Sequence, residues 1–151
     1  MIAEEARKTA IKYLSYRVRT VKEVQDYLRK KRYDQHVVNY VIEYLQNLAY
    51  LDDGNFCNLW IESRIRLKPM GKIRLHSELS AKGIDGNLIE KALDHKLPYD
   101  FELCLARDLV QARLSKCQDT LDKKQEKILL FLQRRGFSNK IIFKMAEEFF
   151  S

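Results

Sequence analysis

The sequence predicts an all-α fold: three tandem three-helix repeats stacked into an elongated array that can curve. Three observations support this prediction. Apolar residues recur at helical spacing along the chain, for example at Ala6, Ala10 and Leu14. No convincing run alternates apolar and polar side chains in the way that a half-buried strand does. The apolar pattern of one segment also returns twice further along the chain, which is the signature of a repeat protein.

The internal repeat is carried by sets of three equivalent apolar residues, one from each copy. Each set keeps nearly the same spacing to the others, and such agreement over several sets is not expected by chance. We therefore predict repeats over residues 1–51, 52–99 and 100–151. A unit of this size is marginal alone, so stacking would bury its remaining apolar surface. The sets are Val24, Leu75 and Ile128; Leu28, Leu79 and Leu132; Tyr33, Ile84 and Phe137; and Val41, Ala92 and Met145.

Polar residues mark the expected beginnings of the helices. Thr20 and Glu23 have the spacing of a capping box at the start of the second helix. Asp52 or Asp53 is expected to cap the first helix of the second repeat, and Asp100 that of the third. The caps expected for the three third helices are Asp34, Asp85 and Ser138.

Each second helix is expected to end in a left-handed turn. Gly83 and Gly136 stand at equivalent positions, and glycine suits the positive φ of such a helix C-cap. The equivalent residue of the first repeat is Arg32, which would adopt the same conformation only with some strain.

The net charge of +7 favours an anionic partner, either nucleic acid or an acidic protein surface. In every repeat the basic side chains concentrate on the second helix and the turns at its ends. A stacked array would present them as a discontinuous basic stripe, although lysine and arginine also occupy ordinary solvated helix faces. The predicted basic stripe consists of Arg17, Arg19, Lys22, Arg29, Lys30, Lys31, Arg64, Arg66, Lys72, Arg74, Lys82, Arg134 and Arg135. For Arg64 we also keep a structural alternative, in which it pairs with an acid between repeats.

The third helices argue against sequence-specific DNA recognition. Helix-turn-helix proteins place a recognition helix in the major groove, with basic or amide side chains facing the bases. Residues 34–48 contain no lysine or arginine, and residues 85–97 are close to neutral. These helices are therefore expected to serve mainly in packing.

The sequence offers no convincing catalytic, metal or cofactor motif. His76 and Glu78 have the H-x-E spacing of zinc deaminases, but the paired cysteines of that site do not follow. Gly83 and Gly86 lack the lysine and hydroxyl residue of a phosphate-binding loop. We expect no enzyme activity, no metal and no cofactor.

Cysteine usage and hydropathy indicate a cytoplasmic protein. The cysteines are Cys57, Cys104 and Cys117, an odd number without a C-x-x-C spacing, which fits a reducing compartment. Cys104 and Cys117 fall on apolar-rich segments and are expected to be small core residues. The first residues do not form a signal peptide, and no stretch has the length of a membrane span.

Residues 48–84 resemble the RecX family. The segment from Leu48 to Phe56, LAYLDDGNF, is similar to the RecX signature Leu-Gly-Tyr-(Leu/Ile)-(Asp/Asn)-Asp-x-x-Phe. Residues 70–74, 78–79 and 81–84 resemble the run that follows it in the family. The likeness spans nearly the whole chain and is weakest in the third repeat. Ala49 stands where the family usually has glycine, and Arg32 stands where glycine is common.

The resemblance implies a regulatory protein that binds the RecA–DNA filament. Such a protein inhibits RecA filament growth, ATPase activity and strand exchange, and it acts in homologous recombination, DNA repair and the SOS response. The implied partner is the RecA filament, with single- or double-stranded DNA as a further partner bound without sequence specificity. We expect the chain to be a monomer.

Two other interpretations stay open. A sequence-independent DNA-binding helical protein would act by competing with RecA for DNA, and its binding would fall steeply with salt. A helical adaptor for another acidic partner would ignore DNA altogether.

Overall fold

The computed structural model describes residues 2–151, which fold into nine helices without a strand in that range. The prediction of an all-α fold is therefore confirmed. The helices are α1 (Ile2–Leu14), α2 (Val21–Lys30), α3 (Gln35–Asn47), α4 (Asp53–Leu67), α5 (Lys72–Ala81), α6 (Gly86–Lys96), α7 (Tyr99–Lys116), α8 (Leu121–Arg134) and α9 (Asn139–Phe150).

Each consecutive set of three helices encloses its own hydrophobic core. We call these units repeat one (α1–α3), repeat two (α4–α6) and repeat three (α7–α9). Leu28, Leu79 and Leu132, which are equivalent in the internal repeat, are completely buried in their respective cores. The division at residues 51 and 99 stays a prediction.

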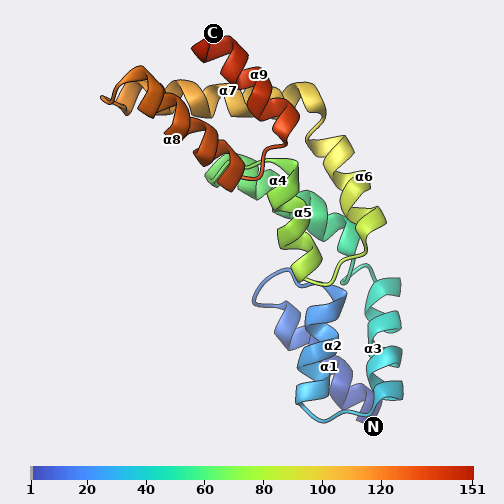
Figure 1. Cartoon of the computed structure of the whole chain (residues 1–151). Coiled ribbons are helices and arrows are strands. Elements are labelled where there is room, and N and C mark those ends of the chain that lie inside the picture. The colour runs from blue at the N-terminus through green and yellow to red at the C-terminus, as the bar shows by residue number, and fades with distance from the viewer. Residues whose placement is uncertain (1) are drawn as a thin grey trace.

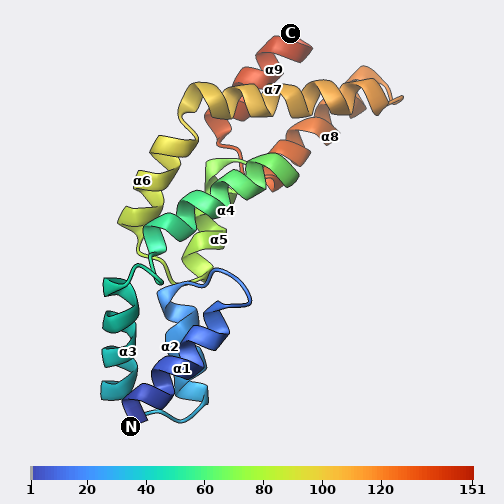
Figure 2. The ribbon, with the colours of Figure 1, turned by 180° about the vertical axis from the view of Figure 1, so that it is seen from behind.

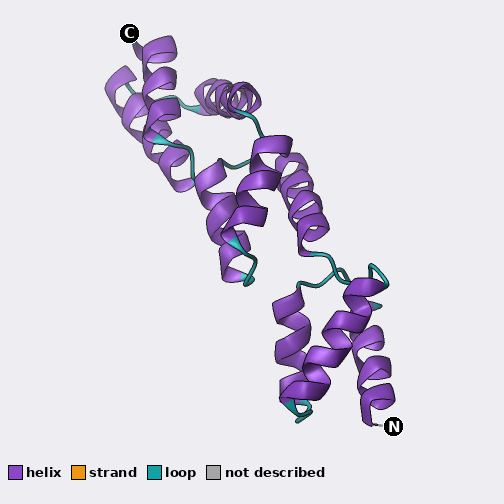
Figure 3. Cartoon of the chain, turned by 90° about the vertical axis from the view of Figure 1, so that its right-hand side faces the viewer, coloured by secondary structure: helices purple, strands orange, loops and turns teal. Residues whose placement is uncertain are grey.

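The three repeats follow one another along an elongated molecule. Repeat one lies at the end that holds the N-terminus, repeat two lies in the middle, and repeat three lies at the opposite end with the C-terminus (Figure 1). The same order is visible from behind in Figure 2 and from the side in Figure 3. Each repeat therefore exposes most of its outer surface to solvent.

The second helices α2, α5 and α8 are arranged head to tail. At the joint between repeats one and two, Thr20 Oγ1 at the start of α2 donates to the carbonyl of Lys82 after α5 (3.1 Å). At the next joint, the amide of Gly71 before α5 donates to the carbonyl of Arg135 after α8 (2.7 Å). Since a helix start has unpaired N–H groups and a helix end has unpaired carbonyls, this order pairs both and aligns the helix dipoles favourably.

Several helix starts agree with the expected caps. The capping box of Thr20 and Glu23 is present in full at the start of α2. Asp52 caps α4 by accepting from the amide of Asn55 (3.0 Å). Ser138 caps α9 by accepting from the amide of Ile141 (3.3 Å).

Other expected caps were wrong in part. Asp34 and Asp85 occupy the N-cap positions of α3 and α6, but neither side chain accepts a capping hydrogen bond. Asp100 is not a cap at all, because α7 already begins at Tyr99 after Pro98. Its carboxylate lies instead in the first helical turn, where the helix dipole favours negative charge.

The left-handed turns after the second helices are confirmed. Arg32 has a φ of 68°, and both Gly83 and Gly136 have a φ of 82°. A Cβ atom at Gly136 would lie 2.4 Å from the amide nitrogen of Arg74, so only glycine fits at that joint. The turn at Arg32 instead lies at the free end of repeat one, where a side chain has room.

The expected core positions of two cysteines were wrong. Cys57 is buried, but Cys104 is exposed because it lies off the face of α7 that buries Ala106 and Val110, and Cys117 is partly exposed because it follows the last residue of α7. None of the helices in residues 2–151 is long and apolar enough to cross a lipid bilayer.

Candidate partner-binding surface

Both joints are built around one acidic side chain. Asp53 Oδ1, in the first turn of α4, accepts from the amide of Val21 at the start of α2 (2.9 Å). Glu102 Oε2, in the first turn of α7, accepts from the amide of Lys72 at the start of α5 (2.8 Å). Burial raises the pKa of each carboxyl group above its usual value, although these hydrogen bonds act to lower it. Repeats two and three therefore each cap the second helix of the repeat before them.

The first joint gathers three residues of the predicted basic stripe. Arg17 pairs with Glu23 (2.5 Å), and the stem of Lys22 covers Gly83, where a Cβ would lie 2.2 Å from its Cδ. Lys82 lies with its Nζ 4.7 Å from the ring centroid of Trp60. Burial acts to raise the pKa of Glu23, but Arg17, the Thr20 amide and Lys82 outweigh it, so the pKa is lowered overall.

The second joint gathers three further residues of the stripe. Arg74 Nη1 donates to the carbonyl of Arg134 (3.4 Å), and Arg135 Nη1 donates to the carbonyl of Pro69 (2.7 Å). Burial lowers the pKa of Arg135, and repulsion from Arg113 and Arg74 lowers it further. Positive side chains are therefore held close together here, and a bound anionic group would reduce the repulsion between them.

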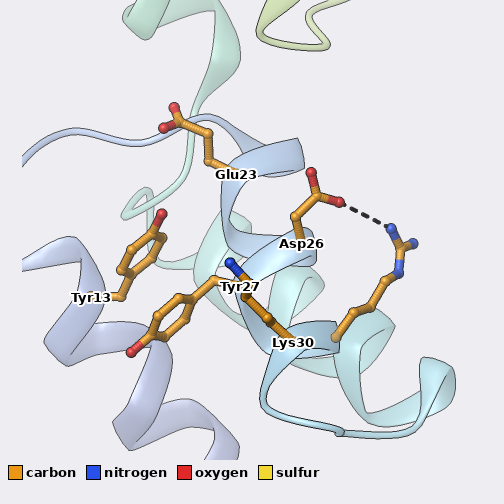
Figure 4. Close-up of a pocket in the computed structure, with 6 residues that line it drawn as sticks. Tyr13, Glu23, Asp26, Tyr27 and Lys30 are labelled. Carbon is orange, nitrogen blue, oxygen red and sulfur yellow. Dashed lines mark hydrogen bonds and ion pairs between the residues drawn. The ribbon is translucent and has the colours of Figure 1, made fainter.

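Two further stripe residues of repeat one, Arg29 and Lys30, line a groove between α1 and α2. Its rings, Tyr13 and Tyr27, are stacked with centroids 3.8 Å apart and reach toward each other from the two helices (Figure 4). The guanidinium of Arg19 lies 3.8 Å from the Tyr13 centroid, and Lys31 Nζ lies 5.5 Å from that of Tyr27. The groove has a volume of about 560 Å³, and Lys30 contributes an exposed ammonium group to it.

Arg19, just before α2, and Arg29, near its end, both lie against neighbouring side chains. Arg29 donates to Gln35 Oε1 (2.9 Å) and pairs with Asp26 (3.4 Å), the ion pair drawn in Figure 4. Nε of Arg19 is buried without a hydrogen-bond partner among residues 2–151. Lys30 and Lys31 are therefore the freer cations at this end of the molecule.

Repeat two holds its stripe residues in two ways. Arg64 is structural, because its Nε and the Trp60 indole N–H both donate to Glu78 Oε1 (3.1 and 3.0 Å). The structural alternative placed the partner acid between repeats, but Glu78 lies in the same repeat as Arg64. Lys72 Nζ approaches Asp94 (3.9 Å), whereas Arg66 is exposed at the end of α4.

Sequence reasoning missed two kinds of residue. The joint acids Asp53 and Glu102 bind amides of another repeat, and a single sequence gives no sign of such a partner. Arg113, Lys116 and Lys127 border a second groove in repeat three. The spacing of Arg113 and Lys116, three residues apart on one helix face, was a signal that could have pointed to it.

The described residues offer surfaces for anionic groups and no cluster suited to metal chemistry. No group of three or more His, Cys, Asp or Glu side chains converges within residues 2–151 in a way that could hold a metal ion. His36 and His95 are exposed.

Comparison with known proteins gives consistent matches. Models of the first and second three-helix domains of RecX match residues 6–45 and 52–93. Regulatory protein RecX of Bacillus pumilus is 37% identical over 140 residues, which cover 92% of this chain and 53% of that protein. Regulatory protein RecX of Finegoldia magna is 32% identical over 136 residues, which cover 89% and 66%.

Two crystal structures are also similar. RecX from Lactobacillus salivarius is 32% identical with a TM-score of 0.80, and the match covers 97% of this chain and 95% of that chain. A second structure, of a regulatory protein RecX, has a TM-score of 0.84 at 21% identity and supports the fold alone. The chain spans about half the length of the first curated relatives it matches, at 53% for two of them.

Proposed function

Because this chain belongs to the RecX family, we propose that it binds the RecA–DNA filament and inhibits filament growth, ATPase activity and strand exchange. Its curated relatives carry the name of regulatory proteins and not of enzymes. The proposed role is a non-catalytic one in homologous recombination and DNA repair, including the SOS response, carried out in the cytoplasm by a monomer.

One observation supports this proposal most directly: the basic side chains are gathered at intervals along an elongated molecule. Arg17, Lys22 and Lys82 mark the first joint, and Arg74 and Arg134 mark the second. A filament repeats the same surface at intervals, so a molecule with spaced binding groups can engage several protomers at once. Linking weak contacts in this way raises the overall affinity beyond that of any one of them.

The electrostatic character of the surface fits either acidic protein or DNA phosphate. Charged groups on an exposed array speed association and do not read base sequence. A second candidate function therefore rests on the same residues: sequence-independent DNA binding that removes DNA from RecA by competition.

Stoichiometry separates the two functions. We would titrate the protein into RecA from the same organism, assembled on single-stranded DNA, and measure ATP hydrolysis. Suppression at a small fraction of one molecule per RecA protomer supports action on the filament. Suppression that begins only when the protein is sufficient to coat the DNA assigns the effect to competition and contradicts the proposal.

A paired variant locates the surface involved. Lys30→Glu with Lys31→Glu reverses two exposed charges, and we expect about tenfold more protein to be needed for half-inhibition, because each charged contact contributes about 1 kcal/mol or less. Lys12→Glu with Lys91→Glu changes the net charge equally at exposed sites outside the predicted basic stripe. If this control loses as much inhibition as the first variant, total charge and not the stripe determines binding.

A further inference from the structure

A second groove runs between α7 and α8 in repeat three. Its volume is about 520 Å³, close to that of the groove in repeat one. Leu109, Ile128 and Phe131 line its apolar part, and Ile128 belongs to the core of the repeat. The cations at its border are Arg113, Lys116, Lys127 and Arg135.

The positive charge around this groove exceeds the negative charge that faces it. Asp119 is bound to Lys127, and that interaction raises the pKa of the lysine and lowers that of the aspartate. Arg113 and Lys116 are exposed and take part in no ion pair within residues 2–151. Three positive side chains therefore remain around an apolar floor without an acidic partner from this chain.

We propose that the groove of repeat three binds an acidic peptide segment that carries one apolar side chain. The apolar side chain would pack on Leu109 and Ala112, over the buried Ile128, and the carboxylates on either side of it would pair with Arg113, Lys116 and Arg135. This inference rests on the proposed function, since it supplies the chemistry of one contact that a protein partner would make. Charge complementarity and the concave apolar floor together favour a peptide.

The same geometry disfavours nucleic acid. Proteins that hold single-stranded DNA without reading its sequence combine a basic groove with open aromatic rings on which bases stack. Phe131 is the aromatic ring of this groove, and the guanidinium groups of Arg113 and Arg135 lie 3.9 and 4.8 Å from its centroid. The ring is also partly buried against the core of repeat three, so a base could stack on it only by displacing these guanidinium groups.

The groove lies apart from the residues that the family models match, which end at residue 93. Its helices α7 and α8 belong to repeat three, at the end of the molecule that holds the C-terminus (Figure 1), and Arg135 links the groove to the second joint. A peptide bound there would tether this end to its partner while the first joint and repeat one make other contacts.

The test is fluorescence anisotropy with the full chain and a labelled synthetic hexapeptide of aspartate and glutamate with one central leucine. We expect saturable binding, weakened at least about tenfold by Lys116→Glu, which corresponds to about 1.4 kcal/mol. Lys116 is exposed at the end of α7, so this change leaves the core intact. Arg113→Gln, which keeps a polar side chain beside Phe131, is a second variant, and we expect it to weaken binding several-fold.

Lys123→Glu is the matched control, because Lys123 is exposed on the same repeat but does not border the groove. It should leave peptide affinity within about twofold of the wild type. A hexapeptide with serine in place of leucine should bind clearly more weakly. Equal binding of the two peptides, or equal losses from Lys116→Glu and Lys123→Glu, would overturn the proposal.

Two further measurements separate this inference from the proposed function. The first uses a labelled single-stranded oligonucleotide. If it binds and loses affinity with Lys116→Glu, while the peptide does not bind at all, the groove is a phosphate site and the peptide proposal is rejected. RecA inhibition by a wild-type protein that fails to bind the peptide would leave the proposed function standing and reject the groove's role. Peptide binding without RecA inhibition would support the groove and contradict the function.

Discussion

Two carboxylates at the joints illustrate how one side chain can hold two repeats together. Asp53 and Glu102 each lie in the first turn of a helix and accept a backbone N–H from the repeat before it. Glu102 retains 4% of its surface exposed, so water cannot replace its bond to the amide of Lys72. Removing a buried acceptor leaves the donor unsatisfied, which costs about 1–3 kcal/mol.

Substitution of Glu102 tests this joint. We expect Glu102→Ala to lower the free energy of unfolding by about 1–3 kcal/mol, because the amide of Lys72 loses its acceptor. Glu102→Gln keeps a carbonyl acceptor and should lose much less. Urea unfolding followed by circular dichroism measures both. An alanine variant as stable as the wild type would show that the joint does not depend on this bond.

Comparison of Glu102→Gln with the wild type also tests how stability depends on pH. Burial holds the pKa of Glu102 above its value in the unfolded chain, so the folded state binds the proton more tightly. The contribution of Glu102 is therefore greatest below the unfolded pKa and is lost as the pH rises through the folded pKa. Glutamine does not titrate, so Glu102→Gln should gain stability relative to the wild type between about pH 4 and pH 7. A difference that stays constant over this range would contradict the linkage.

Relief of backbone strain at Arg32 is expected to raise the stability of the fold. Its φ of 68° is unfavourable for a residue with a Cβ, so Arg32→Gly should stabilise the fold by about 0.5–1 kcal/mol. Arg32→Ala removes the charge but keeps the Cβ, and we expect no such gain. Thermal unfolding of the three proteins decides the matter, since equal gains from glycine and alanine would point to charge and not to backbone strain.

At this scale the sequence was informative where a residue's role is local. Arg32 could be placed in a left-handed turn because Gly83 and Gly136 occupy the equivalent positions, and the capping box of Thr20 is contained in one short segment. Asp100 was misjudged because α7 begins at Tyr99, two residues earlier than a cap at Asp100 requires. Glu102 could not be recognised at all, since its partner is an amide in a different repeat.

Among the elements, the second helices carry the connections between repeats. Thr20 makes two hydrogen bonds through Oγ1 at the start of α2. It accepts from the amide of Glu23 and donates to the carbonyl of Lys82 (both 3.1 Å). A helix cap and an inter-repeat bond therefore depend on one hydroxyl group.

Thr20→Val removes both bonds and keeps the shape of the side chain. We expect a loss of about 1–2 kcal/mol in unfolding free energy and faster amide exchange in the first turn of α2. Thr120→Val is the matched control, because Thr120 stands at the N-cap of α8 without a side-chain capping bond. Thr120 is also exposed, so comparable losses in the two variants would mean that the change from threonine to valine itself, and not the two bonds of Thr20, is responsible.

Helix periodicity predicted the elements well, because each helix shows one apolar face to the core of its own repeat. Val24 and Leu28 are buried in α2 as their spacing requires, and so are Leu75 and Leu79 in α5. The basic residues of the second helices could be listed from the sequence for the same reason. The contacts of the stripe residues could not be listed, because Arg64 on α4, and Arg74 and Arg135 at the second joint, bind partners that only the packing of helices brings near.

The whole molecule depends on close approach at the second joint. A Cβ atom at Gly71 would lie 2.4 Å from the carbonyl oxygen of Gly136, so Gly71→Ala must displace repeat three from repeat two. Because each repeat has its own core, we expect helix content to be retained while small-angle scattering reports a changed overall shape. On the proposed function, RecA inhibition should weaken several-fold as the spacing of the contacts is lost.

Gly86→Ala controls for this change, because a Cβ there meets nothing within 4 Å. It should leave both scattering and inhibition as they are in the wild type. If Gly71→Ala changes the shape without affecting inhibition, the two ends of the array do not act together on one partner.

The arrangement of the repeats was predicted only in outline. Stacking into an elongated array followed from the small size of each unit, but the head-to-tail order of α2, α5 and α8 did not. That order arises from hydrogen bonds between backbone groups, such as the amide of Gly71 and the carbonyl of Arg135, which leave no mark on side-chain patterns.

The similarity of the two joints bears on how such a chain changes length over evolution. Repeat two carries both halves of a joint: Asp53 and Gly83 face the repeat before it, and the start of α5 faces the repeat after it. A gene duplication that copies this unit in frame would therefore place the start of α5 in one copy against Asp53 and Gly83 of the next. Repeat one lacks the glycine of this boundary, because Arg32 stands at the position of Gly83.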